Sequence, residues 1–250
     1  DARIPRASRN PDLSELVKNK KRLLILNKSD LAEESATRAW MNYYRAQGID
    51  CMSFDSAKGR AKDVIARIEK AASEAVARMA ARGVKKTVRV MIVGVPNVGK
   101  STFTNKVNGS SIAKTGDRPG VTRSNQWVKI TPYLELLDTP GLLWPKLDDQ
   151  EDARALAFVG TINDQIMDQQ MLAVRLLEML MENKPDAAIA RFKIKDASLR
   201  GVALLEEACR GRGWLMPGGV MDTDRGAAVI LDEFRGGKLG RISMEFPDNF

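Results

Sequence analysis

The segment GVPNVGKST, residues 94–102, has the residue types and spacing that hold the phosphates of a nucleotide. Gly94, four further residues and then Gly99-Lys100-Ser101 form a complete phosphate-binding loop, with an apolar run before it and a helical pattern after it. Backbone N–H groups of such a loop surround the phosphates, and Lys100 supplies a positive charge to the β- and γ-phosphates. The Ser101 hydroxyl can coordinate Mg²⁺. The pattern therefore predicts binding of a magnesium nucleoside triphosphate.

Two later segments could complete the contacts to magnesium and to the γ-phosphate. Asp138-Thr-Pro-Gly141 follows a predicted strand, and Asp138 can hold Mg²⁺ through water while the Gly141 N–H reaches the γ-phosphate. Thr122, within GDRPGVTR at 116–123, could join the Mg²⁺ shell when the triphosphate is bound. Alone, DTPG would be read as an ordinary turn after a strand, and a threonine in a Gly/Pro loop is common and therefore weak evidence. Their order and spacing after the phosphate loop favour the functional interpretation.

The segment RLLILNKSD, residues 22–30, carries the residues that could select the base. The Asp30 carboxylate can accept hydrogen bonds from the N1–H and the 2-amino group of guanine, which adenine does not offer in that arrangement. Asn27 would tie this loop to neighbouring backbone, and the stem of Lys28 would cover the ring face. By itself the segment also reads as an exposed turn at a strand end.

A second base-recognition segment, Ser56-Ala57-Lys58, follows the next predicted strand, and a backbone N–H there could meet guanine O6. Both base segments precede the phosphate loop in the chain. In the familiar GTPases the phosphate loop comes first, so the order of the motifs is rotated here. Strand ends cluster at one edge of a parallel sheet, and the strands can be reconnected there. Two base segments in their own correct order make a chance match to guanine recognition improbable.

Strands and helices must alternate to bring these segments together. We expect strands over 22–27, 49–54, 87–94, 126–130 and 134–138, the last two as a hairpin, and helices over 36–48, 60–81 and about 100–107. Unalternating apolar strands favour a largely parallel sheet in an α/β layer. From about residue 150 the apolar spacing is helical, including 199–210, so we expect two domains, 1–148 and 149–250.

Composition narrows the class of protein. The 250 residues, 44% of them hydrophobic, suffice for a core and contain no apolar stretch of membrane-spanning length. The chain has no histidine, which excludes histidine catalysis and histidine metal ligands within it, and Cys51 and Cys209 match no metal spacing and are expected to be reduced thiols. Residues 1–86 carry 19 Lys/Arg against 11 Asp/Glu. This excess suggests a polyanionic partner, most simply nucleic acid, or else a lysine- and arginine-rich solvent face.

The motifs resemble those of the circularly permuted GTPases, and within them the ribosome biogenesis GTPase A family, also called YlqF/RbgA. The resemblance is dense over 1–146 and thinner over 213–245, and it is carried by DARIPRASRNPDL, LLILNKSDL, GVPNVGKSTFTNKV, AKTGDRPGVTRSNQWVKI and LELLDTPGLLWPK. It implies a circularly permuted P-loop GTPase domain with a smaller C-terminal helical domain, residues 149–250, that contacts ribosomal RNA. It also implies a cytoplasmic, ribosome-associated, monomeric protein, without a membrane partner, that binds GTP and GDP and matures the large-subunit precursor through its rRNA.

Related potassium-responsive GTPases place an asparagine at the loop position of Asn97, which implies a K⁺ site beside the Mg²⁺ site. The expected catalytic residues are Lys100, Thr122 and Asn97, and the expected metal ligands are Ser101, Thr122, Asp138 and, for K⁺, Asn97. The expected GTP-binding residues are Asn27, Lys28, Asp30, Ser56, Ala57, Lys58, Asn97, Val98, Gly99, Lys100, Ser101, Thr102 and Gly141.

The chain also departs from related GTPases. The family carries an upstream segment with a histidine implicated in hydrolysis, and this sequence contains neither. Leu142 stands where Ras-like enzymes have the water-orienting glutamine, and we expect it to pack against apolar neighbours. Hydrolysis without a partner is therefore expected at or below about 10⁻⁴ s⁻¹.

Two other functions remain open: a nucleotide-gated RNA- or protein-binding module with incidental turnover, and a permuted GTPase acting on the small subunit. The latter would be expected to carry an oligonucleotide-binding barrel and a Cys/His zinc module, which two scattered cysteines and no histidine oppose.

Overall fold

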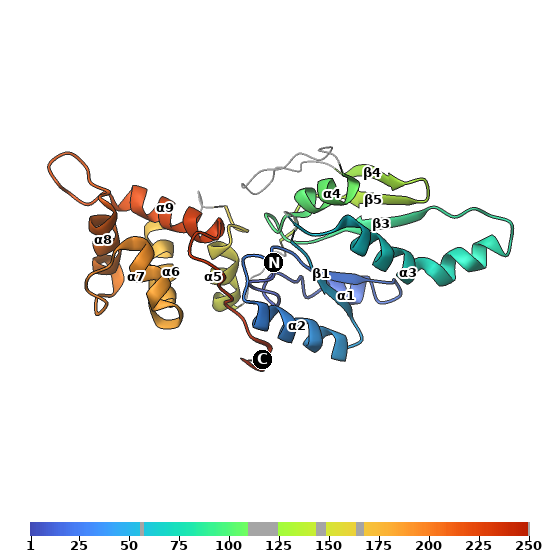
Figure 1. The fold of residues 1–250 in the computed structure, drawn as a ribbon, viewed down its shortest axis with the longest axis horizontal. Helices are drawn as coiled ribbons and strands as arrows, with labels where there is room; N and C mark the ends of the chain where they lie inside the picture. The colour runs from blue at the N-terminus through green and yellow to red at the C-terminus, as the bar shows by residue number, and fades with distance from the viewer. Residues whose placement is uncertain (56–57, 110–124, 144–148, 164–167, 250) are drawn as a thin grey trace. The chain divides into compact units, whose positions relative to one another are not determined.

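The structure is a computed structural model that describes residues 1–55, 58–109, 125–143, 149–163 and 168–249 (Figure 1). The chain divides into two compact units, one formed by Asp1–Leu147 with Ser243–Phe250 and the other by Asp148–Ile242. Within the described ranges, we find no helix with the length and apolar character of a membrane span.

The strands of the first unit form two sheets. β1 (Leu23–Leu26) pairs in parallel with β2 (Asp50–Ser53). β3 (Val88–Ile92) pairs in parallel with β5 (Leu134–Asp138), which also pairs with β4 (Gln126–Thr131) as the expected antiparallel hairpin. The sequence predicted a single, largely parallel layer, and the structure differs because no ladder joins β1 to β3 among the described residues. The α/β class is confirmed.

Side-chain packing connects the two sheets where backbone pairing does not. Helices α3 (Ala61–Ala80) and α4 (Lys100–Asn108) border a buried cluster to which both sheets contribute. Phe54, just after β2, meets Phe103 of α4 edge to face, with ring centroids 5.1 Å apart. Ile25 of β1 and Val90 of β3 pack against this same cluster. The shared core thus holds together the two strand ends from which the predicted base and phosphate segments leave.

A second core lies on the other side of β1 and β2. The short helix α1 (Leu13–Leu16) precedes β1 in the chain, and helix α2 (Glu34–Ala46) follows β1. Trp40 and Tyr44 of α2 are buried and stacked, with ring centroids 5.5 Å apart. The Tyr44 hydroxyl donates to the Pro5 carbonyl at 3.0 Å, which ties the N-terminal segment to α2.

The last residues of the chain return to the first unit, although we had assigned them to the helical domain. The Glu245 carboxylate accepts hydrogen bonds from the N–H groups of Arg6 at 2.6 Å and Ala7 at 3.0 Å. Trp40 donates its indole N–H to the Glu245 carbonyl at 2.9 Å, and the Met244 N–H donates to the Arg3 carbonyl at 2.9 Å. A short 3₁₀ turn, η2 (Pro247–Asn249), ends this tail.

Replacing Glu245 with alanine is expected to destabilise the protein by about 1–3 kcal/mol, because two N–H groups lose their acceptor beside a largely buried position. The urea midpoint measures this loss. Glu245→Gln keeps one acceptor oxygen and should lose less, and Glu182→Ala, at an exposed glutamate of the second unit, should lose almost nothing. Equal midpoints for Glu245→Ala and Glu182→Ala would contradict the role given to this carboxylate.

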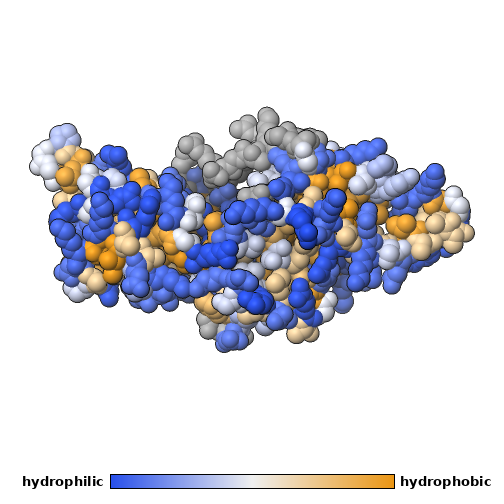
Figure 2. Space-filling model, viewed as in Figure 1, coloured by the Kyte–Doolittle hydropathy of each residue, from blue (hydrophilic) through white to orange (hydrophobic). Residues whose placement is uncertain are grey.

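The second unit is mainly helical in its described residues, with an isolated antiparallel bridge between Leu215 and Met221. It consists of α5 (Gln150–Phe158), α6 (Gln169–Asn183), α7 (Pro185–Phe192), α8 (Gly201–Arg212) and α9 (Thr223–Arg235). Helix α6 has seven buried residues and packs against α7, α8 and α9. In both units the visible face is largely hydrophilic, with small apolar patches (Figure 2).

Candidate nucleotide-binding site

The predicted phosphate loop connects β3 to α4 and contains two left-handed residues. Asn97 has φ 58° and Gly99 has φ 89°, and Gly99 is the N-cap of α4. Asparagine tolerates this conformation better than most residues. The φ at position 99 favours glycine, and a Cβ there would lie 2.6 Å from the side-chain nitrogen of Asn27, which would have to move. The loop therefore presents the N-terminus of α4 to an anion.

The Lys100 ammonium lies over the loop from which it projects. Its Nζ donates to the carbonyl oxygens of Gly94 at 3.0 Å and Val95 at 2.9 Å. Burial lowers the pKa of Lys100 to about 8, and the negative charge of Asp138 opposes part of this shift. The lysine is thus partly dehydrated and in reach of phosphates bound in the loop.

Ser101 and Asp138 meet as the predicted magnesium site requires. The Ser101 hydroxyl donates to Asp138 Oδ2 at 2.9 Å. Asp138 is fully buried and its Oδ1 has no hydrogen-bond partner among the described residues. Burial raises the pKa of this carboxyl, against the hydrogen bond from Ser101 and the charge of Lys100. A hydroxyl beside an unpaired buried carboxylate oxygen fits a magnesium–water cluster.

The protein side of this site is incomplete without phosphate oxygens. Within the described ranges, no group of three His, Cys, Asp or Glu side chains lies close enough to hold a metal ion by itself. Thr122, the remaining predicted ligand, lies outside the described residues. The residues present therefore fit a Mg²⁺ ion that arrives with a nucleotide, because hydroxyl, carboxylate, water and phosphate oxygens would share it.

The DTPG segment lies directly on the phosphate loop. A Cβ at Gly141 would fall 2.5 Å from the Cα of Pro96, so only glycine allows this approach. The Thr139 hydroxyl donates to the Ile92 carbonyl at 2.6 Å and so joins the ends of β5 and β3. The Leu142 side chain is 62% exposed, so our expectation that it packs against apolar neighbours was wrong. The backbone fixes this residue instead, because the Leu142 N–H donates to the Gly94 carbonyl at 3.2 Å.

The first base segment is bonded to the phosphate loop although the two are about seventy positions apart in the chain. Asn27 Nδ2 donates to the Val98 carbonyl at 2.9 Å, and Lys28 Nζ donates to the Asn97 carbonyl at 2.7 Å. Lys28 itself has φ 56°, which turns the chain so that Asp30 follows in an exposed position. Asn27 thus has the backbone-anchoring contact that the sequence predicted.

The second base segment starts beside the first. The Ser29 N–H donates to the Phe54 carbonyl at 3.2 Å, and the Phe54 N–H donates to the Leu26 carbonyl at 2.9 Å. Lys58 is exposed and its N–H donates to Asp55 Oδ1 at 3.2 Å. Ser56 and Ala57 lie outside the described residues. Thr102 is exposed in the first turn of α4.

Sequence reasoning missed three contributors to the site. Pro96 presents the backbone against which Gly141 packs, and Thr139 connects the ends of two strands. Arg3 is almost fully buried, and burial lowers its pKa to about 10. The negative charge of Asp30 opposes part of this lowering. A glycine and a proline at facing turns could have suggested the first contact. A buried arginine ahead of the base segment has no local signal.

Comparisons with known proteins agree with this geometry. The family model described as 50S ribosome-binding GTPase matches residues 89–197, which begin after both base segments. Proteins named ribosome biogenesis GTPase A from Bacillus cereus and Priestia megaterium are 40% and 42% identical, covering 100% and 99% of this chain and 85% and 87% of theirs. The solved structure of GNP-bound YlqF from T. maritima is 27% identical, covers 99% of this chain and 90% of its own, and superposes with a TM-score of 0.67.

Proposed function

The chain belongs to the ribosome biogenesis GTPase A family, and from this premise we propose that it is a GTP-hydrolysing assembly factor whose nucleotide state controls its binding to large-subunit precursors. One observation carries the nucleotide part of the proposal. Asn27 of the base segment is bonded to the Val98 carbonyl of the phosphate loop, so a base and its phosphates would be read by two directly connected loops. Such a connection supports the rotated order of the motifs as a functional arrangement.

The proposed roles follow from the contacts around that connection. Asp30 reads guanine, Lys28 covers the ring, and the backbone of Ser56-Ala57-Lys58 meets O6. Lys100 and the N–H groups of Asn97 to Thr102 hold the phosphates. Ser101, Thr122 and, through water, Asp138 would hold Mg²⁺, which would supply positive charge to the phosphates. Gly141 supplies an N–H near the γ-phosphate.

The ribosomal part of the proposal rests on the names of the relatives and on the basic first third of the chain. We place the protein in the cytoplasm, bound to the large-subunit precursor through its rRNA and acting as a monomer. Both cysteines, Cys51 and Cys209, are buried free thiols, which suits a reducing compartment. Burial raises the pKa of each thiol to about 11, so neither is reactive near neutral pH.

Sedimentation with purified large-subunit precursors tests this function. The protein with a non-hydrolysable GTP analogue should co-sediment, the protein with GDP should not, and precursors should raise its single-turnover hydrolysis rate. Small subunits provide the matched control and should do neither. Binding that is equal in the two nucleotide states would overturn the proposed control by nucleotide. Nucleotide-dependent binding without any change in rate would favour the module with incidental turnover.

Hydrolysis is also expected to be faster in potassium than in sodium at equal ionic strength, by roughly tenfold, a barrier change of about 1.4 kcal/mol. The reason is that an Asn97 side-chain oxygen could help to hold K⁺, which would supply positive charge to the transition state. Single-turnover rates in the two salts measure the effect. Asn97→Gly keeps the left-handed backbone and removes the oxygen, so its two rates should be equal. Equal rates in the unaltered protein would remove K⁺ from the mechanism.

A further inference from the structure

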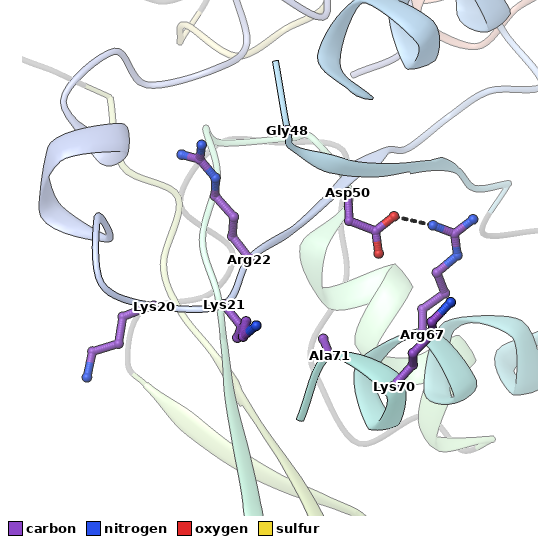
Figure 3. Close-up of a pocket in the computed structure, with 8 residues that line it drawn as sticks. All are labelled: Lys20, Lys21, Arg22, Gly48, Asp50, Arg67, Lys70 and Ala71. Atoms are coloured by element: carbon purple, nitrogen blue, oxygen red, sulfur yellow. Dashed lines mark hydrogen bonds and ion pairs between the residues drawn. The ribbon is translucent and has the colours of Figure 1, made fainter. Parts of the chain in front are cut away.

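A pocket of about 600 Å³ lies in the first unit at the end of β1 and β2 opposite the base segments. Arg22 directly precedes β1 and Asp50 begins β2, whereas Asn27 follows the last residue of β1. Basic residues line the pocket from two elements, the segment before β1 and helix α3, and the side chains of Lys20 and Arg22 point away from those of α3 (Figure 3). Its lining consists of Lys20, Lys21, Arg22, Gly48, Asp50, Arg67, Lys70 and Ala71. The candidate nucleotide site uses none of these residues.

The charge of this pocket is strongly unbalanced. Five of the lining residues are cationic and one is acidic, and that acid, Asp50, already pairs with Arg67. Lys21 pairs with Glu74 at 3.5 Å, but both side chains are more than 70% exposed, so the pair contributes little. In the part of the chain that the structure describes, Lys20, Arg22 and Lys70 have no ion-pair partner. The lining therefore carries an excess of positive charge, which attracts an anion.

The shape and lining of the pocket favour one kind of anion. A Cβ at Gly48 would meet nothing within 4 Å, so the pocket is open above the turn that precedes β2. Apart from the charged residues, only Gly48 and Ala71 line it, which leaves no large apolar side chain to anchor a protein partner or a lipid. An arginine fork and several lysine point charges on two elements instead suit successive phosphates of a nucleic-acid strand.

We propose that this pocket binds the phosphate backbone of RNA, and that it holds the protein on its substrate from the side opposite the nucleotide. The inference rests on the proposed function, which supplies ribosomal RNA as the partner. Contacts to phosphates set affinity and position without reading sequence. The binding should therefore depend strongly on salt and weakly on the sequence of the RNA.

The test is RNA binding by the full chain, with a GTP analogue, to a duplex fragment of large-subunit rRNA over a series of KCl concentrations. Arg22→Gln/Lys70→Gln removes one cation from each side of the pocket. The matched control, Arg78→Gln/Lys129→Gln, removes two exposed cations of the same unit that do not line it. The slope of log K against log salt should become less steep in the pocket variant, by an amount that corresponds to about two lost phosphate contacts. In the control variant the slope should change clearly less. GTP affinity should be unchanged in both, which checks the fold.

Each outcome decides between the alternatives. Equal losses of RNA affinity in the two double variants would show that only net charge matters. That result would overturn the inference and leave the proposed function intact. Failure of the unaltered chain to bind both this RNA and ribosomal precursors would instead refute the proposed function. Displacement of the RNA by a poly-glutamate peptide of matched charge, at equal concentration, would assign the pocket to an acidic protein and also overturn the inference.

Discussion

Replacing Asp30 with asparagine is expected to lower the affinity for GTP by at least about 100-fold and to shift the preference to xanthosine triphosphate. The carboxylate would accept two hydrogen bonds from guanine, and hydrogen bonds to charged groups contribute about 1.5–3 kcal/mol each. Asparagine keeps one acceptor oxygen for N1–H but turns an amide donor toward the 2-amino group, and the lost bond together with the unpaired donors costs about 3 kcal/mol or more, which is over two orders of magnitude in affinity. With xanthine the asparagine oxygen accepts from N1–H and the amide donates to the C2 carbonyl, so the new pairing has two hydrogen bonds again.

The effect should be confined to recognition of the base, because other residues hold the loop. Asn27 is bonded to Val98 and Lys28 to Asn97, and Asp30 itself is exposed. Equilibrium titration with guanosine and xanthosine nucleotides measures the change. Glu34→Gln makes the same chemical replacement at an exposed helix position four residues away and should leave both affinities unchanged. Unaltered GTP affinity in Asp30→Asn would remove residues 27–30 from the site.

Local signals predicted the elements that carry the site with small errors at their ends. The helix expected over 36–48 lies at Glu34–Ala46, and the strand expected over 87–94 lies at Val88–Ile92. Unbroken apolar runs and terminal glycines are properties of short stretches, so they can be recognised without knowledge of the fold. The phosphate loop can also be recognised from a short stretch, because the turn itself requires its glycines, as the φ of 89° at Gly99 illustrates.

Contacts between residues far apart in the chain could not be predicted from such local signals. The return of Glu245 to the N–H groups of Arg6 and Ala7 joins residues 239 and 238 positions apart, and a single acidic residue near the end of a chain does not indicate it. The contact of Phe54 with Phe103, which helps to connect the two sheets, likewise joins residues far apart in the chain. These are outcomes of packing, in which several segments must be placed at once.

The candidate site shows the same limit on a smaller scale. Ser101 and Asp138 could be named separately as magnesium ligands from their motifs, but their hydrogen bond of 2.9 Å depends on the parallel pairing of β3 with β5. That pairing also buries Asp138 completely and leaves one of its oxygens without a hydrogen-bond partner among the described residues. Motifs therefore predict which groups take part, whereas their protonation and their readiness for a ligand depend on burial.

Burial of Lys100 leads to an expected loss of nucleotide affinity at alkaline pH, about tenfold for each pH unit above 8. In the nucleotide-free protein the pKa of Lys100 is about 8, because the ammonium is desolvated over the carbonyls of Gly94 and Val95. Bound phosphates favour the charged form and raise this pKa. Below pH 8 the lysine is charged in both states and affinity is flat. Above pH 8, binding must take up one proton, so affinity falls until the pKa of the bound state is reached.

Titration of GDP between pH 7 and 9, compared with the same titration of Lys100→Arg, isolates this proton from the ionisation of the base. Arginine remains charged over the whole range, so the ratio of the two affinities should be constant to about pH 8 and then change with a slope of one proton. Lys106→Arg, at the other end of α4, is the matched control and should follow the unaltered protein. A ratio that stays constant to pH 9 would show that Lys100 is fully charged before the nucleotide binds. Its contacts with the loop carbonyls would then provide enough solvation to offset its burial, and the phosphate loop would hold a preformed ammonium at every physiological pH.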